Sequence, residues 1–322
     1  CASIKKGRAI SIYSITGSNS TIHIENTTFQ GLHADKGGAI YVSISDNGRV
    51  TINASTFDKN VALVTGGAIH IEKGAITNII ENSIFRENKA MATGGALHVE
   101  KEGRNRTSKL EVKKTRFLEN TAYVSGGAIL FKKGHLSILC SEFADNVVDS
   151  QNVAASNYSL LRGGGAVAVL SQNSRAEIFS SAFHGNKVVC IERETAGAGV
   201  YIGNGSSLKL SETIFYNNHA TNGTWSDISS VHTGNESNLT SSRCDNQYLT
   251  NETNFTQCQP AEMCESSFVF FKEGSLLEIS HCLFQGCSNG MCASIKKGTL
   301  RAISIYSISG SNSTIHIDNT TF

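Results

Sequence analysis

The 322-residue sequence has one proline, Pro260, almost no net charge and no long hydrophobic run. With 28 lysines and arginines against 27 aspartates and glutamates, the formal net charge is +1, which gives no indication of binding to nucleic acid or to an acidic membrane. No apolar run approaches the roughly 20 residues that a helix needs to cross a bilayer. One proline and 30 glycines are typical of extended segments separated by tight turns, so we expect a β-rich chain.

The nine cysteines show no C-x-x-C spacing, and no His-x-x-x-His spacing occurs, which argues against a zinc site. Most of them lie in the last third of the chain, around one irregular region, as is typical of disulfides that brace loops without a core of their own. We therefore predict disulfides, with open connectivity, among Cys244, Cys258, Cys264, Cys282, Cys287 and Cys292.

Acceptor motifs for N-glycosylation, Asn-x-Ser/Thr, are more frequent than chance predicts and are concentrated between Asn222 and Asn254. The alternative is that a turn composition rich in Ser, Thr and Asn creates such motifs by accident. We expect instead a secreted protein with N-linked glycans as its only added groups, and no cofactor or metal. The acceptors are Asn19, Asn26, Asn53, Asn105, Asn157, Asn204, Asn222, Asn235, Asn238, Asn251, Asn254, Asn312 and Asn319.

The first segment of the chain recurs at its end. Residues 1–29 return as residues 292–322, with an inserted Thr299-Leu300 and only two mild substitutions. The offset is about 293 residues, so we interpret the chain as one period of a longer tandem array plus the start of the next. This favours an architectural role.

A shorter repeat of about 28 to 32 residues lies within the long one. One landmark is Gly-Gly-Ala-aliphatic, which begins at Gly37, Gly66, Gly94, Gly126 and Gly164, with a variant at Gly197. The other is Phe-x-x-Asn, found at Phe57/Asn60, Phe85/Asn88, Phe117/Asn120, Phe143/Asn146, Phe183/Asn186 and Phe215/Asn218.

Residues between the two landmarks alternate between apolar and polar, as in Ile69-His70-Ile71-Glu72, which is the period of a β-strand. Units this short cannot each close a core, but stacked units bury a continuous one. The sequence therefore predicts an all-β, right-handed parallel β-helix solenoid over residues 1–322, with about eight coils per long period. Phe and inward Ile, Val and Leu should form interior stacks, and the asparagines should hydrogen-bond along a turn.

Two segments interrupt the rhythm. We predict a short insertion at 147–161 and a long insertion at 219–265, which holds five acceptor motifs, three cysteines and the only tryptophan. Insertions in solenoids project from one edge and often carry contacts, so the long one is the expected place for specific binding.

The paired Gly-Gly-Ala-Ile and Phe-x-x-Asn motifs resemble the repeats of polymorphic membrane protein adhesins. The resemblance covers about residues 29–218 and implies a right-handed β-helix with an adhesive or structural role at the cell surface. The long tandem period is not part of that family's motif.

Many parallel β-helices act on polysaccharides, which requires paired carboxylates on one face or a calcium-binding acid cluster. Asp145, Glu142 and Glu119 lie near turns, but acids do not concentrate at one position of adjacent coils. His70 and His98 occupy one outward position in neighbouring coils and could share a metal, although a plain surface ladder is favoured. Glu72 and Glu100 also stack, as in a solvated charge ladder. We expect no enzyme.

The sequence thus favours a structural component of an extracellular glycosylated filament or fibrous coat, whose partner is a further copy of itself. The alternative is a cell-surface adhesin that binds cell-surface or matrix glycans through residues 219–265. A carbohydrate-active enzyme is the remaining alternative. We expect no partner nucleic acid and no membrane span in residues 1–322.

Overall fold

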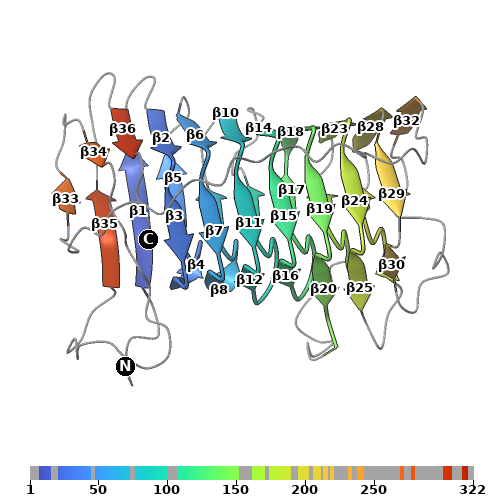
Figure 1. The fold of residues 1–322 in the computed structure, drawn as a ribbon, viewed down its shortest axis with the longest axis horizontal. Helices are drawn as coiled ribbons and strands as arrows, with labels where there is room; N and C mark the ends of the chain where they lie inside the picture. The colour runs from blue at the N-terminus through green and yellow to red at the C-terminus, as the bar shows by residue number, and fades with distance from the viewer. Residues whose placement is uncertain are drawn as a thin grey trace.

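The computed structural model is a parallel β-solenoid in which short strands stack along one long axis (Figure 1). It describes residues 7–15, 21–44, 48–72, 77–100, 108–151, 162–170, 174–189, 195–202, 206–211, 213–216 and 218–220, and beyond these the strands at 231–233, 238–242, 269–271, 277–279, 300–306 and 314–317. Within this part of the chain there is no helix, and so none that could cross a membrane. The predicted all-β parallel solenoid is confirmed.

Each coil contributes strands to three sheets. In stacking order, the ten-stranded sheet contains β32 (Asn238–Ser242), β28 (Ser207–Ser211), β23 (Arg175–Phe179), β18 (Gly134–Leu139), β14 (Ser108–Lys113), β10 (Thr77–Glu81), β6 (Arg49–Asn53), β2 (Thr21–Glu25), β36 (Thr314–Ile317) and β34 (Leu277–Ile279). The seven-stranded sheet contains β29 (Ile214–Tyr216), β24 (Ala182–His184), β19 (Glu142–Ala144), β15 (Arg116–Leu118), β11 (Ile84–Arg86), β7 (Thr56–Asp58) and β3 (Thr28–Gln30).

The seventeen-stranded sheet receives two strands from most coils, one on each side of the Gly-Gly-Ala turn. Its members are β1 (Gly7–Ile15), β4 (His33–Lys36), β5 (Ile40–Ile44), β8 (Val61–Thr65), β9 (Ile69–Glu72), β12 (Lys89–Ala90), β13 (Leu97–Glu100), β16 (Thr121–Ala122), β17 (Ile129–Lys132), β20 (Val147–Asp149), β22 (Val167–Leu170), β25 (Lys187–Val189), β27 (Val200–Ile202), β30 (His219–Ala220), β31 (Val231–Thr233), β33 (Val269–Phe271) and β35 (Leu300–Tyr306). A separate pair is formed by β21 (Arg162–Gly163) and β26 (Thr195–Ala196).

The core is a set of side-chain ladders, because in-register parallel pairing places equivalent residues of successive coils on top of one another. Phe29, Phe57, Phe85, Phe117, Phe143 and Phe183 are fully buried and stack with ring centroids 4.5 to 4.8 Å apart. The predicted aliphatic position, five residues before each Phe, forms a second buried ladder of Ile24, Ile52, Ile80, Val112, Ile138 and Ile178.

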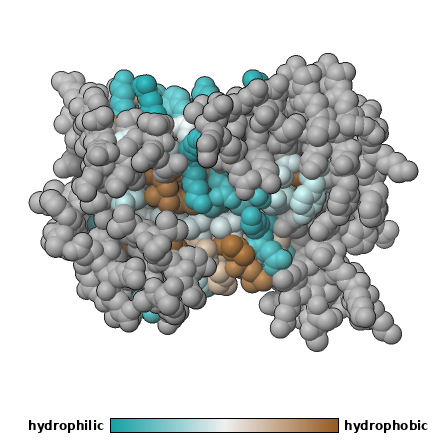
Figure 2. Space-filling model, turned by 180° about the vertical axis from the view of Figure 1, so that it is seen from behind, coloured by the Kyte–Doolittle hydropathy of each residue, from teal (hydrophilic) through white to brown (hydrophobic). Residues whose placement is uncertain are grey.

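The surface carries no continuous hydrophobic band among the described residues. On the face shown in Figure 2, brown hydrophobic areas are separated by teal hydrophilic ones. The exposed large hydrophobic residues of the described part are Leu63, Val64 and Leu139. The alternation of strand residues therefore sends most apolar side chains to the interior.

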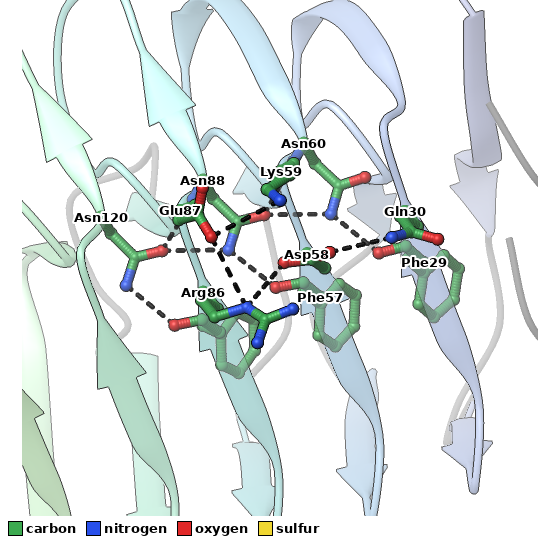
Figure 3. A network of polar contacts seen from close by, with 11 residues as sticks. Phe29, Gln30, Phe57, Asp58, Lys59, Asn60, Arg86, Glu87, Asn88 and Asn120 are labelled. Atoms are coloured by element: carbon green, nitrogen blue, oxygen red, sulfur yellow. Dashed lines mark hydrogen bonds and ion pairs between the residues drawn. The ribbon is translucent and has the colours of Figure 1, made fainter. Parts of the chain in front are cut away.

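A buried ladder of asparagine amides runs beside the phenylalanine ladder (Figure 3). The Asn88 amide donates to the Asn120 side-chain oxygen at 2.9 Å and to the Phe57 carbonyl at 2.9 Å. The same Asn120 oxygen accepts the backbone N–H of Asn88 at 3.1 Å. This pattern repeats from Asn60 to Asn218, so each asparagine joins three successive coils, as predicted for the Phe-x-x-Asn motif.

The Gly-Gly-Ala turn brings backbone against backbone. Gly66 has φ +65°, a conformation that residues with a Cβ rarely adopt. Gly67 has ordinary φ, but a Cβ there would lie 1.9 Å from the Gly95 carbonyl oxygen of the next coil. The two glycines are therefore needed for different reasons.

The order of stacking differs from the order of the chain in one place. Strands β35 and β36 pair with β1 and β2, at the N-terminal edge of the solenoid, rather than following β31 and β32 (Figure 1). The expected single run of coils in chain order from residue 1 to residue 322 does not hold for these strands. Among the described residues, seven strands stack in the seven-stranded sheet and ten in the ten-stranded sheet, so the coil count differs slightly from the eight predicted per long period.

Parts of both predicted insertions form strands that pair with regular coils. Residues 147–149 form β20, which pairs with β16 and β25, so they belong to a regular coil. Three strands within 219–265, namely β30, β31 and β32, stack on β25, β27 and β28. Ser150 and Gln151 follow β20 within the described residues, and the rest of both segments lies outside them.

Candidate functional site

The candidate site is a line of side chains at the second residue after each Gly-Gly-Ala turn, which we call the outer ladder. Register places Ser11, Tyr41, His70, His98, Leu130, Ala168 and Tyr201 on top of one another. In each strand the neighbours on both sides, such as Ile69 and Ile71, point into the main core. The outer ladder therefore lies on the opposite face of its strands.

The outer ladder is buried, which corrects the prediction that His70 and His98 form a solvent-exposed surface ladder. His70 is 0% exposed and His98 is 1% exposed. The reason is the sharp bend of each coil, which returns the residue before the glycines over the outer face. Thr65 Oγ1 lies 2.8 Å from His70 Nδ1, and Thr93 Oγ1 lies 2.9 Å from His98 Nδ1.

Aromatic rings continue along the ladder. The Tyr41 and His70 rings are parallel, with centroids 5.5 Å apart, and the His70 and His98 rings are 4.8 Å apart. Leu130, Ala168 and Tyr201 extend the line as a small apolar cluster that is separate from the main core. Histidine and leucine thus occupy equivalent buried positions in adjacent coils.

His98 lies between a hydroxyl and a carboxylate. Burial lowers the pKa of His98, so the imidazole is neutral at pH 7. Its Nε2 lies 3.3 Å from Glu100 Oε2 without hydrogen-bond geometry, and its Nδ1 lies 2.9 Å from Thr93 Oγ1. The adjacent His98 side chain, together with Lys132 at 2.9 Å, holds the pKa of Glu100 well below its usual range.

Glu72 has the equivalent role in the preceding coil. It accepts the Tyr41 hydroxyl at 2.6 Å and lies 3.4 Å from Lys36 Nζ. Burial, together with the hydrogen bond to Glu72, raises the pKa of Tyr41 well above its usual value. Glu72 and Glu100 do stack, as predicted, but they are partly buried acceptors within the outer ladder rather than a fully solvated row.

The carboxylates of the outer ladder, Glu72 and Glu100, are paired with lysines. Among the described residues, no three His, Cys, Asp or Glu side chains gather as metal ligands would. The chemistry available is the closing of a bend by hydrogen bonds and ion pairs, with charge buried only where it is paired.

We expect that replacing His98 by leucine, the residue that follows it in the ladder, makes the free energy of unfolding decrease less as the pH falls. Because the folded pKa lies below the unfolded value of about 6.5, the unfolded chain binds the extra proton, and stability is lost as pH falls below about 6.5. Urea unfolding of His98→Leu between pH 7 and 5 should show a smaller loss than the parent chain. His33→Gln, at an exposed position, is the control, and an unchanged slope in His98→Leu would refute this assignment.

The acidic residues that the sequence analysis weighed against an enzyme site, Glu119, Glu142 and Asp145, do not form a pair. Glu142 lies 2.6 Å from Arg116 Nε and 3.0 Å from His184 Nε2. Glu119 and Asp145 sit at turn positions with φ of 55° and 54°. Glu119 and Asp145 therefore belong to a row of turn residues along the coils. Glu142 instead contacts Arg116 and His184, in a network that spans three coils.

We predict that Glu142→Gln weakens the fold at neutral pH and reduces its sensitivity to acid. The hydrogen bond from His184, together with Arg116, lowers the pKa of Glu142, so its contribution is present above the unfolded pKa of about 4.3 and is lost as pH falls. Thermal unfolding at pH 7 and pH 3.5 checks this. Equal destabilisation at both values would show that the charge of Glu142 does not matter.

Most of the predicted modification sites lie outside the described residues. This holds for the six cysteines from Cys244 to Cys292, so their pairing stays a prediction. Cys140 is described, and it is an exposed free thiol. Among the acceptor asparagines, Asn26 and Asn53 are described with side chains, and the Asn53 amide donates to Glu25 at 2.8 Å. Glycan occupancy also stays a prediction.

Comparison with known proteins gives one family match. Residues 54–72 match the model of the Chlamydia polymorphic membrane protein repeat. The matched segment spans β7, β8 and β9, and so contains one Phe-x-x-Asn turn, one Gly-Gly-Ala-Ile turn and His70. No curated protein and no solved structure matches the chain. The chain is a parallel β-solenoid repeat protein in which residues 54–72 are similar to the polymorphic membrane protein repeat.

Proposed function

We propose that the chain is a stiff, non-enzymatic building element of an extracellular or cell-surface filament or fibrous coat. The observation that carries this proposal is the unbroken asparagine ladder from Asn60 to Asn218. Each step joins one coil to the next through buried hydrogen bonds, beside a continuous stack of phenylalanine rings. A rod of this kind resists bending and separation along its axis because every coil is tied to both neighbours.

Sequence repetition supports the same proposal. The long period would extend the rod by identical units, and a solenoid pairs nearly all its strand edges internally, which avoids uncontrolled lateral aggregation. N-linked glycans and disulfides in residues 219–292 would then shield and brace the least regular part. Both modifications belong to the proposal.

A surface adhesin is the second candidate, and the match of residues 54–72 to the polymorphic membrane protein repeat favours it. In this case the solenoid would be a stalk, and residues 219–265 would bind glycans of a cell surface or matrix. Both candidates place the protein outside the cell or on its surface, and they differ in whether copies continue one another along an axis.

Electron microscopy of the native, unfractionated extracellular material distinguishes the two. Long thin fibres with an axial repeat of about 38 Å, which is eight coils at about 4.8 Å each, are expected for the filament. Short free rods, or spikes anchored at one end to a membrane, would contradict the filament and favour the adhesin.

A further inference from the structure

The N-terminal edge of the solenoid is occupied by the chain's own second copy of that coil. Strand β35 pairs with β1 in parallel, and β36 pairs with β2 (Figure 1). The register is exact with respect to the internal repeat, since Ile10 lies opposite Ile303 and Tyr13 opposite Tyr306. The edge is therefore covered by the segment that is nearly identical to the coil forming it.

The edge suits such a segment because its inward positions are apolar and its backbone pairs in parallel with the added strands. Ile10, Ile12, Ile22 and Ile24 belong to the main core and are at most 1% exposed. Their register partners in β35 and β36 are again isoleucines, namely Ile303, Ile305, Ile315 and Ile317. The pairing therefore keeps the register of the internal repeat, and a slip of one residue would place isoleucine positions opposite polar ones.

Placing β35 and β36 on their own chain's edge requires the connection to return along the whole stack. In the ten-stranded sheet β32 and β34 form opposite edges, and the sheet between them spans about 43 Å at about 4.8 Å per strand. The same contacts are available to the segment of a neighbouring chain, without loss of any strand pairing. Such an exchange is a low-cost route to association.

We propose that the edge formed by β1 and β2 is a docking surface for residues 300–317 of a second copy of this chain. The contact is heterologous, because the N-terminal edge of one copy meets the C-terminal segment of another. A heterologous contact that does not close generates an open linear assembly. This deepens the proposed function, on which it rests, by naming the surface and the segment through which copies are joined.

Dityrosine cross-linking of isotopically mixed protein tests the proposal. Unlabelled and ¹⁵N-labelled full chains are mixed in denaturant, refolded together and photo-cross-linked, and the Tyr13–Tyr306 peptide is weighed by mass spectrometry. We expect cross-linked peptides that carry one label from each parent. The Tyr13–Tyr41 pair, with ring centroids 5.0 Å apart within one chain, is the internal control and should carry a single label.

Ile303→Pro in the full chain removes a backbone donor from β35 and should abolish the Tyr13–Tyr306 product while keeping Tyr13–Tyr41. A Tyr13–Tyr306 product with only one label would show that the segment closes on its own chain and would overturn the proposal, as would absence of this product in the parent chain. Electron microscopy reports separately on the proposed function. Fibres without mixed-label peptides would remove this docking surface alone, whereas mixed-label peptides without fibres would remove the filament alone.

Discussion

Gly95→Ala is expected to be among the most damaging single substitutions at the described glycines. A Cβ at this position would lie 2.0 Å from the Gly127 carbonyl oxygen and 2.7 Å from the backbone of Thr121. Both neighbours are backbone atoms held in the sheets of the following coil, so no side chain can move aside. We expect a loss of more than about 4 kcal/mol in the free energy of unfolding, or failure to fold.

Gly31→Ala is the matched control. Gly31 has φ +65°, but nothing lies within 4 Å of a Cβ built there, so only the backbone strain of about 1–2 kcal/mol applies. Urea unfolding followed by circular dichroism measures both variants. An equal loss of stability in Gly95→Ala and Gly31→Ala would contradict the explanation that the second glycine is required because successive coils approach closely at the Gly-Gly-Ala turn.

Asn120→Ala should have the second largest effect, because it breaks the buried amide ladder in the middle. The Asn88 backbone N–H and side-chain amide lose the acceptor that they share, and the Phe85 carbonyl loses a donor at 2.9 Å. Each buried group left unpaired costs about 1–3 kcal/mol, so we expect a total loss of about 3–6 kcal/mol. Chemical denaturation of protein made without glycosylation measures it.

Asn53→Ala provides the comparison, since Asn53 also belongs to an amide contact between coils but on the surface. Its side chain donates to Glu25 and accepts from Asn82, in positions that water can replace. A change within about 0.5 kcal/mol is expected. Similar losses in the two variants would contradict the view that the Phe-x-x-Asn ladder stabilises the fold because its amides are buried.

Much of the solenoid could be predicted because each of its ladders consists of one residue type that recurs at a fixed position in every coil. Phe57 and Ile52 are inward in the structure as their spacing indicated, and Asn60 joins coils as its motif indicated. Glycine, phenylalanine and asparagine recur with the same period because each is required at one place in the cross-section. That period therefore gives the length of one coil.

The burial of His70 and His98 could not be predicted from alternation alone. Alternation assigns the face of a strand, but it does not tell whether the chain before the turn folds back over that face. Thr65 and Thr93 give the only local signal, because a hydroxyl recurs five residues before each histidine. Leu130, in the same ladder, indicated that the position tolerates an apolar residue.

The backbone conformation of the turns could not be predicted from the sequence either. Ala54 and Cys140 have φ of 47° and 48°, at a turn that precedes the phenylalanine strands, although neither residue favours this region. Stacking on equivalent turns of adjacent coils imposes the conformation. The position of β35 beside β1 was likewise not expected, because a repeat predicts which segments are equivalent but not which edge each of them joins.

X-ray diffraction from aligned fibres of the native material tests most directly whether the chain forms a filament of stacked coils. We expect a strong reflection near 4.8 Å along the fibre axis, because coils are stacked along it. A longer axial spacing of about 38 Å, the height of eight coils, should accompany that reflection. A 4.8 Å reflection perpendicular to the axis, or none at this spacing, would contradict a filament built by end-to-end continuation of the solenoid.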